Sequence, residues 1–213
     1  GWEQLGAAIL GEAVEDRSGC SISISGDGGV VAIGASRNDG NGVRSGHARI
    51  FQWDGNVWNQ LGDDIDGEAA GDWFGDAITL SRDGLTVAVG AQLNDAESYF
   101  NAGHARIYRW DGTAWNQLGS DLDGETSIDH FGSKISISGD GNTVIIGAED
   151  NQGGSIAAGH ARVYRWDGTA WNQLGNDLDG EAVHDNFGSS VSISNDGNTI
   201  AIGADGNDGS GSS

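Results

Sequence analysis

One segment recurs through the whole chain at nearly constant spacing. A Trp-x-Gln-Leu-Gly segment begins four times, in steps of 56, 57 and 56 residues, at Trp2, Trp58, Trp115 and Trp171. A Gly-His-Ala-Arg segment follows the same period and begins at Gly46, Gly103 and Gly159. Self-similarity at a fixed period is typical of repeat proteins, in which each unit buries its apolar face against its neighbours. The sequence therefore predicts one array of similar units, with no linker and no second domain.

Each unit contains four β-type runs. Residues 21–25 alternate serine with isoleucine, the period of two that indicates a strand with two different faces. Residues 144–148 show the second run, which is continuously apolar and suits a strand covered on both sides. Asp-Gly pairs such as Asp27-Gly28 separate the two runs and predict a tight type I′ hairpin. A third run, another Asp-Gly turn and the Trp-x-Gln-Leu run complete a four-stranded antiparallel meander.

Such a meander cannot bury both of its faces alone, but stacking against copies of itself around an axis covers them. We therefore expect an all-β fold, a β-propeller built from four-stranded antiparallel blades of about 56 residues. The expected units are 1–15 (fourth strand and loop of a preceding blade), 16–71, 72–128 and 129–184 (blades), and 185–213 (partial blade). Three full blades plus partial ones predict an incomplete propeller. It is either a fragment of a longer propeller or one chain of an assembly that completes it.

Short sequence motifs inside the units resemble those of a known family. Asp-x-Phe-Gly begins at Asp72, Asp129 and Asp185, and each copy continues through a strand to a Val-Gly-Ala or Ile-Gly-Ala ending. These motifs resemble FG-GAP repeats, the integrin-α-type propeller blades. The resemblance implies about seven blades and an extracellular or cell-surface protein. Copy one departs from the pattern, with Arg17-Ser18-Gly19 at the Phe-Gly position. The calcium loop that the resemblance places between the first two strands is shortened here to a turn.

Composition excludes several function classes. Ten Lys and Arg residues against 32 Asp and Glu residues give a formal net charge of −22. Nucleic-acid binding relies on clustered basic side chains, so neither DNA nor RNA is an expected partner. No apolar run approaches the ~20 residues of a membrane-spanning helix, so we expect no membrane insertion in this segment. The single cysteine, Cys20, cannot form an internal disulfide or a thiolate cluster.

Sequence variation between copies points to one end of the blades as a binding face. The loop between the first and second strands and the loop between the third and fourth strands share one end of every blade, and both are near-identical Asp-Gly turns. The loops at the other end, including residues 92–102, differ between copies. Binding residues concentrate on variable loops. Five side chains there replace small or polar residues of the other copies: Trp73, Tyr99, Phe100, His130 and His184. They suit stacking on a sugar ring or docking of a partner's loop. The alternative is that Trp73 and Phe100 cover the blade edge.

Three Asp-x-Asp-Gly-Glu segments offer alternating carboxylates beside a glycine. Hard oxygen ligands presented in this way are what Ca²⁺ prefers. The candidate ligands of a weak cation site are Asp64, Asp66, Glu68, Asp121, Asp123, Glu125, Asp177, Asp179 and Glu181. The alternative is a solvated loop, because a complete ligand set is absent and copy one reads Ala-Ile-Leu-Gly-Glu. We therefore expect no cofactor other than Ca²⁺.

The recurring Gly-His-Ala-Arg segment predicts a structural role. An active site needs each group once and converging on one point, whereas equivalent positions in successive blades are spread apart. We expect each arginine to form an ion pair with a loop carboxylate, since an unpaired buried charge is costly. No nucleophile elbow or phosphate loop is present, so the chain is not expected to be an enzyme.

These observations predict an extracellular or cell-surface propeller for adhesion or for matrix or fibre assembly. Its expected partner is another protein or a copy of itself, bound through the variable loops. The second hypothesis is a carbohydrate-binding propeller that uses Trp73, Tyr99 and Phe100. The third is a propeller enzyme whose catalytic blade lies outside this segment.

Overall fold

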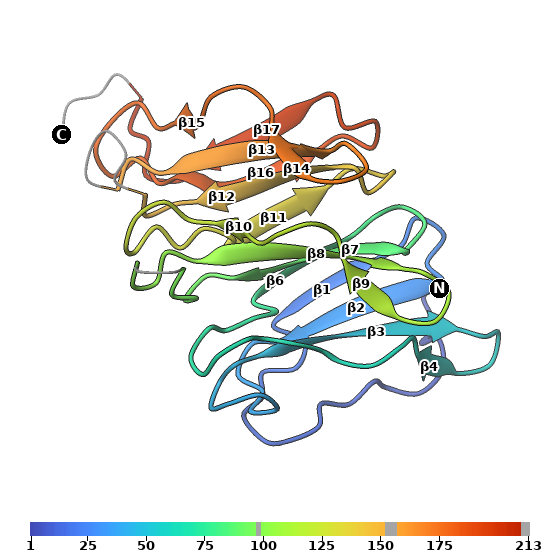
Figure 1. Ribbon diagram of the computed structural model, residues 1–213. Helices are drawn as coiled ribbons and strands as arrows, with labels where there is room; N and C mark the ends of the chain where they lie inside the picture. The colour runs from blue at the N-terminus through green and yellow to red at the C-terminus, as the bar shows by residue number, and fades with distance from the viewer. Residues whose placement is uncertain (97–98, 152–156, 210–213) are drawn as a thin grey trace.

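The computed structural model describes residues 1–96, 99–151 and 157–209, and its regular structure over these residues is entirely β-strand (Figure 1). The first sheet contains β1 (Ser21–Ile24), β2 (Val30–Ala35), β3 (His47–Trp53), β4 (Trp58–Gln60) and β5 (Ile65–Asp66). The second contains β6 (Ala77–Leu80), β7 (Thr86–Ala91), β8 (His104–Trp110), β9 (Trp115–Gln117) and β10 (Leu122–Asp123). The third contains β11 (Lys134–Ile137), β12 (Thr143–Ala148), β13 (His160–Trp166), β14 (Trp171–Gln173) and β15 (Leu178–Asp179). A final pair consists of β16 (Phe187–Ile193) and β17 (Ile200–Ala204).

Neighbouring strands within each sheet pair antiparallel, in the chain order expected for a meander. The all-β fold built from repeated blade-like sheets is therefore confirmed. None of the described residues forms a helix of the length and apolarity that a membrane span requires.

The fourth run of each blade differs from the prediction because it is split into two short strands. β3 pairs with β4 at one end and with β5 at the other. Between them, Gly62 adopts a positive φ of 78° and turns the chain. The carbonyl of Leu61 faces the next blade, where it accepts a hydrogen bond from the indole Nε1 of Trp115 at 2.7 Å. The split thus gives the next blade a backbone acceptor.

The fourth strand expected near Trp2 is absent, since residues 1–20 form no strand. This segment pairs with no strand among the described residues. It still occupies part of the fourth-strand position, because the carbonyl of Leu5 accepts from Nε1 of Trp58 at 2.9 Å. That contact repeats the Leu61–Trp115 bond of the next interface.

The Asp-Gly hairpins are present, but their turns are not of type I′. Of Asp27 and Gly28 only the glycine has positive φ, at 76°. The loop is closed by a bond from the amide of Ser25 to the carbonyl of Val30 at 2.9 Å. The Asp27 carboxylate accepts from the amide of Gly29 and the hydroxyl of Ser25. These side-chain hydrogen bonds stabilise a loop that is longer than the predicted two-residue turn.

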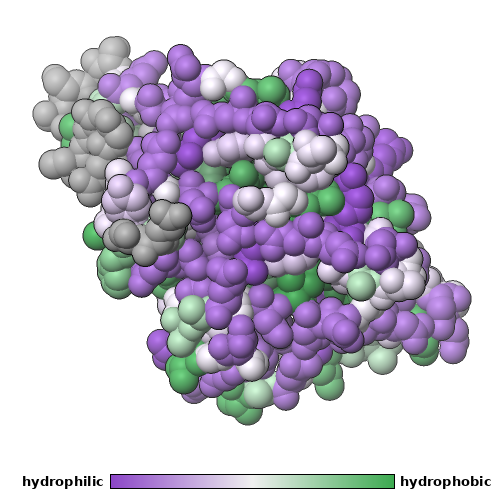
Figure 2. All heavy atoms as spheres, in the orientation of Figure 1, coloured by the Kyte–Doolittle hydropathy of each residue, from purple (hydrophilic) through white to green (hydrophobic). Residues whose placement is uncertain are grey.

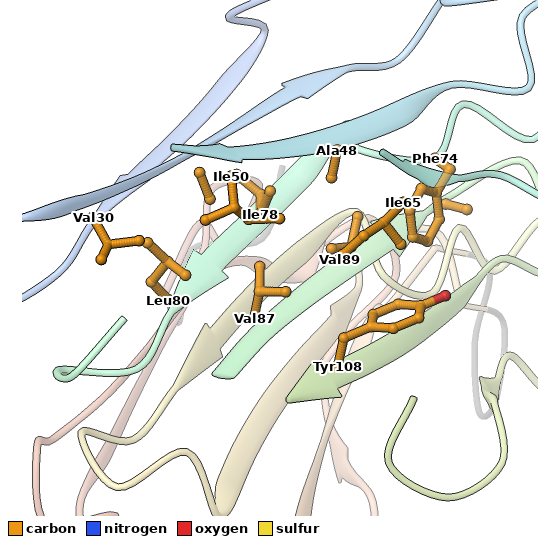
Figure 3. Packing of buried hydrophobic residues seen from close by; sticks show 12 residues of the cluster. Val30, Ala48, Ile50, Ile65, Phe74, Ile78, Leu80, Val87, Val89 and Tyr108 are labelled. Carbon is orange, nitrogen blue, oxygen red and sulfur yellow. The ribbon is translucent and has the colours of Figure 1, made fainter. Parts of the chain in front are cut away.

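Successive blades lie side by side through their first strands. β1 contacts β6, β6 contacts β11, and β11 contacts β16. The core lies between the sheets. Figure 3 shows Val30 and Ile50 of the first blade facing Ile78, Leu80 and Val87 of the second, all of them buried. Burying such side chains stabilises the fold by roughly 1.5–3 kcal/mol each, so most of the apolar driving force holds one blade to the next.

The Phe-Gly and Gly-Ala motifs contact each other at these interfaces. The amide of Phe131, which is fully buried, donates to the carbonyl of Ala102 in the preceding blade at 2.9 Å. The next residue, Gly132, places its carbonyl directly against the Cα of Gly90, where a Cβ on Gly90 would overlap that oxygen. Glycine is required at position 90 by this close approach of two backbones. The Phe-Gly and Gly-Ala motifs thus form one contact between adjacent blades.

Candidate functional site

The loops at the variable end of the blades bring distant residues together. In the second blade, the amide of Gly103 closes the loop by donating to the carbonyl of Asn94 at 2.9 Å. The amide of Asn101 donates to the Asp95 carboxylate at 2.8 Å. The amide of Ile128 then donates to the carbonyl of Phe100 at 2.9 Å. This bond joins the loop to the connection that leads into the third blade.

Three apolar side chains are exposed at this junction, and we name them the loop patch: Tyr99, Phe100 and Ile128. Their exposed fractions are 48%, 62% and 45%. Residues 97 and 98 of the same loop lie outside the described residues (Figure 1). In Figure 2 the viewed face is dominated by hydrophilic residues, and hydrophobic ones form small separate groups. Aromatic side chains are enriched at protein–protein interfaces relative to the rest of the surface.

The backbone of Ile128 supports a functional interpretation of the loop patch. Ile128 has a φ of 66°, in the left-handed region that β-branched residues avoid. Its equivalents in the other copies are Glu15, Gly71 and His184, with φ values of 73°, 94° and 63°. The connection therefore requires a positive φ, and this copy meets that requirement with a bulky residue at a cost of about 1–2 kcal/mol. Residues held against backbone preference concentrate at functional sites.

Trp73 lies away from the loop patch, between the first and second blades. Its ring is half-buried, and the guanidinium carbons of Arg17 and Arg37 lie 5.9 and 5.2 Å from its centroid. These are cation–π contacts with the first blade. Trp73 is thus engaged inside the chain, in agreement with the interpretation that it covers a blade edge.

The two histidines differ in their relation to the loop patch. The amide of His130 donates to the carbonyl of Asn101, the residue after Phe100, at 3.4 Å. His130 Nδ1 lies 2.6 Å from the Asp150 carboxylate of its own blade. His184 is exposed, with a φ of 63° at the position equivalent to Ile128. Of the five predicted ligand-binding residues, the structure therefore brings together Tyr99, Phe100 and the backbone of His130, and leaves Trp73 and His184 apart.

The carboxylates of each Asp-x-Asp-Gly-Glu segment are divided between two blade interfaces. Asp64 accepts from the Gln60 amide at 2.6 Å and lies 3.6 Å from His47 of its own blade. Glu68, at the other end of the segment, reaches the next blade and lies 3.6 Å from Arg106. The segment therefore does not act as one ligand set.

At each blade interface, a glutamate of one segment lies beside a histidine and an aspartate of the next blade. The three equivalent triads are Glu12–His47–Asp64, Glu68–His104–Asp121 and Glu125–His160–Asp177. The possible ligand atoms in each triad lie within 4.8 Å of one another. The remaining predicted ligands, Asp66, Asp123, Asp179 and Glu181, stand outside the triads and are exposed.

An arginine in each interface already pairs with the glutamate of the triad. Arg49, Arg106 and Arg162 lie 3.3, 3.6 and 3.4 Å from the glutamate of the preceding segment. The predicted ion pairs of the Gly-His-Ala-Arg arginines are therefore confirmed. Each guanidinium also lies over an aromatic ring, that of Phe74 in the case of Arg106. These contacts assign the recurring arginines to blade stacking.

The triad histidines are neutral. Nε2 of His104 accepts a bond from Nε of Arg106 at 3.4 Å, which leaves Nδ1 to carry the proton and point to Asp121 at 3.6 Å. Burial, followed by the charge of Arg106, lowers the pKa of His104 to about 4, although Asp121 opposes the shift. Burial is also the main cause that lowers the pKa of His47 and of His160.

The position of the family's calcium loop does not fit that ion. In the third blade, Asp140 of the short turn accepts from the Ser138 hydroxyl and from the amide of Asn142. Asp27 makes the same two kinds of bond in the first blade. Because each of these carboxylates is bound by its own turn, the turns do not supply the six to eight free oxygens that Ca²⁺ takes. Calcium binding elsewhere stays a prediction.

Ile128 is the loop-patch residue that the sequence analysis missed. Its signal was present in the repeats, because Gly71 of one copy is replaced by isoleucine in the next. The other two copies have Glu15 and His184 at this position, also with positive φ. Ile128 differs from them because it is β-branched and apolar, and β-branched residues tolerate positive φ least.

Repeated blades packed side by side through their first strands define a propeller-type repeat protein. Residues 11–51 and 178–213 match the FG-GAP repeat family, which together is about a third of the chain. The two matched segments are therefore FG-GAP repeats, in agreement with the resemblance of the Phe-Gly and Gly-Ala motifs. No curated protein matches the sequence.

Among solved structures, the chain is similar to a protein from Bacteroides uniformis that is named as a 6-phosphogluconolactonase. The two share 13% sequence identity with a TM-score of 0.53. The likeness covers 85% of this chain and 46% of that one, so the chain spans about half the length of its structural relative. At this identity the likeness shows a shared fold and does not transfer the named activity.

Proposed function

We propose that the chain is a non-catalytic binding segment of an extracellular or cell-surface protein. It serves adhesion or matrix assembly by holding a partner protein against the loop patch. The observation that carries the proposal is the loop patch itself, in which two exposed aromatic residues adjoin a strained, exposed isoleucine. FG-GAP repeats, which form propeller-type protein-binding domains, support the same class of function.

The chemistry of the loop patch favours a protein partner. Aromatic side chains bring large apolar area at a small cost in conformational entropy and dominate the anchors of protein interfaces. A sugar ring stacks on a free aromatic face, yet Trp73, one of the three residues predicted for that role, is engaged with Arg17 and Arg37. These contacts weigh against the carbohydrate-binding alternative.

A non-catalytic role is supported by the distribution of the titratable groups. The histidines of the triads recur once per interface and are buried and neutral, and His104 and His160 each accept a hydrogen bond from an arginine. A general base must reach the proton that it abstracts in a single convergent site. The recurring triads do not provide one, and their contacts stabilise the stacking of blades.

Ile128→Gly separates binding from folding. Glycine accepts the left-handed backbone at this position, so the variant should be at least as stable as the parent chain while it loses a loop-patch side chain. The matched control is Leu85→Ser, which removes an exposed side chain beside an Asp-Gly turn at the opposite end of the second blade.

The test measures binding of the immobilised chain to a panel of purified extracellular-matrix proteins and to a glycan array. We expect binding to a matrix protein that falls at least tenfold in Ile128→Gly combined with Phe100→Ser and persists in Leu85→Ser. Binding unchanged in the double variant would refute the role of the loop patch. A sugar signal lost in Trp73→Ala would support the carbohydrate-binding alternative.

A further inference from the structure

The first strand of the first blade exposes a face that is buried or half-buried in the later blades. Ile22 and Ile24 of β1 are 69% and 62% exposed. Their equivalents in β6, Ile78 and Leu80, are 8% and 7% exposed. The same chain thus shows this face once uncovered and repeatedly covered. We refer to the Ile22–Ile24 surface as the open β1 face.

The later blades show what covers such a face. Ile78 and Leu80 pack against the second strand of the preceding blade, where Val30 and Ala32 are buried. A serine of the preceding first strand completes the contact, because the hydroxyl of Ser23 accepts from the amide of Leu80 at 2.9 Å. The cover is therefore a blade surface of small apolar side chains with a serine acceptor.

The last two strands present a surface of that kind. On β16 and β17 the residues equivalent to Ser23 and Ala32 are Ser192 and Ala201, and both are exposed. The corresponding serine of the third blade, Ser136, accepts from the amide of Ile193 at 3.2 Å. We refer to the surface of Ser192 and Ala201 as the open β17 face. The two ends of the chain carry the two halves of one interface.

We propose that the open β17 face of one copy binds the open β1 face of a second copy, so that chains associate head to tail. In the contact, the hydroxyl of Ser192 accepts from the amide of Ile24, as that of Ser23 does from Leu80 within the chain. The inference rests on continuity with the interfaces inside the chain and does not depend on the loop patch. A heterologous contact of this kind forms rings when its rotation closes and open filaments when it does not.

Two features set the expected strength. The last sheet has two strands among the described residues, so it covers only the inner part of the open β1 face. Each chain also carries a formal charge of −22, which opposes association. Salt screens this repulsion, and at 1 M the Debye length falls to about 3 Å. Association should therefore be weak, dependent on concentration and strengthened by salt.

Sedimentation velocity on the 213-residue chain, from micromolar to several hundred micromolar and at low and high salt, tests the proposal. We expect the mass to rise with concentration, and more so in high salt. Ile22→Lys combined with Ile24→Lys should abolish the rise, and Ala201→Arg should abolish it as well. The control Val57→Lys, at an exposed site on a distant turn, should associate as the parent does.

Mixing the two blocked variants identifies the geometry. Each retains the face that the other has lost, so head-to-tail contact predicts a mixture that forms dimers and nothing larger. If two open β1 faces paired with each other, Ala201→Arg alone would associate like the parent, and the head-to-tail proposal would be wrong. A parent chain that stays monomeric at every concentration and salt level would overturn it too. Unchanged melting curves confirm that each variant is folded.

Discussion

Replacing Gly90 with alanine tests the contact between the Phe-Gly and Gly-Ala motifs. A Cβ at this position would overlap the carbonyl oxygen of Gly132 in the next blade and lie 3.0 Å from its carbonyl carbon. Both obstacles are backbone atoms, so relief requires the two blades to separate. Overpacking of a well-packed site costs about 1–3 kcal/mol. Because the obstacle is rigid backbone, we expect Gly90→Ala to lower the free energy of unfolding by about 3 kcal/mol.

Gly203→Ala is the matched control because it makes the same change in the last blade. There the added Cβ meets the hydroxyl of Ser190, and the next nearest atom is 3.6 Å away. A side-chain hydroxyl can rotate, so the expected cost is below about 1 kcal/mol. Urea denaturation followed by tryptophan fluorescence gives both free energies of unfolding. By thermal melting, about 3 kcal/mol corresponds to roughly 6–12 °C. Equal losses in the two variants would refute the proposed backbone contact.

Three further predictions concern the triads. Folding lowers the pKa of His104 from its ordinary 6.5 to about 4, so its stabilising effect is present above pH 6.5 and is lost as the pH falls towards 4. The pH dependence of the urea midpoint should show this loss, up to about 3 kcal/mol, in the parent and not in His104→Gln; parallel profiles would contradict it. Arg106→Met should cost about 2–3 kcal/mol and Glu68→Gln below about 1 kcal/mol, because Glu68 is half exposed; a double-mutant cycle with no coupling would show that the pair does not interact. Millimolar Ca²⁺ or a chelator, at matched ionic strength, should leave the melting midpoint unchanged, whereas a rise of several degrees with Ca²⁺ would reveal a cation site.

Much of the fold could be predicted because the repeats report the same structure several times. The alternation of Ser21–Ile24 and the apolar run of β2 identified two paired strands, and the structure pairs them antiparallel. The split of the fourth strand could not be predicted from strand periodicity. It depends on the Leu61 carbonyl bonding to Trp115 of the next blade, a contact that only the assembled blades reveal.

The candidate site was predicted less completely for a similar reason. Variation between copies selected Tyr99 and Phe100, which do lie together. The same criterion selected Trp73, whose surroundings of Arg17 and Arg37 come from another blade. The acidic segments seemed local in sequence, yet Asp64 and Glu68 serve different interfaces. Local patterns locate turns and strands, but partners across an interface depend on how blades stack.

The side-by-side stacking of first strands can be measured directly by NMR on the isotope-labelled chain. The amide nitrogen of Leu80 lies 2.9 Å from the hydroxyl oxygen of Ser23, and that of Ile193 lies 3.2 Å from the hydroxyl oxygen of Ser136. We predict nuclear Overhauser cross-peaks from both amide protons to the β-protons of the two serines. If these cross-peaks were absent while those between strands of one blade, such as Ile78 opposite Val89, were present, the blades would not stack in this way.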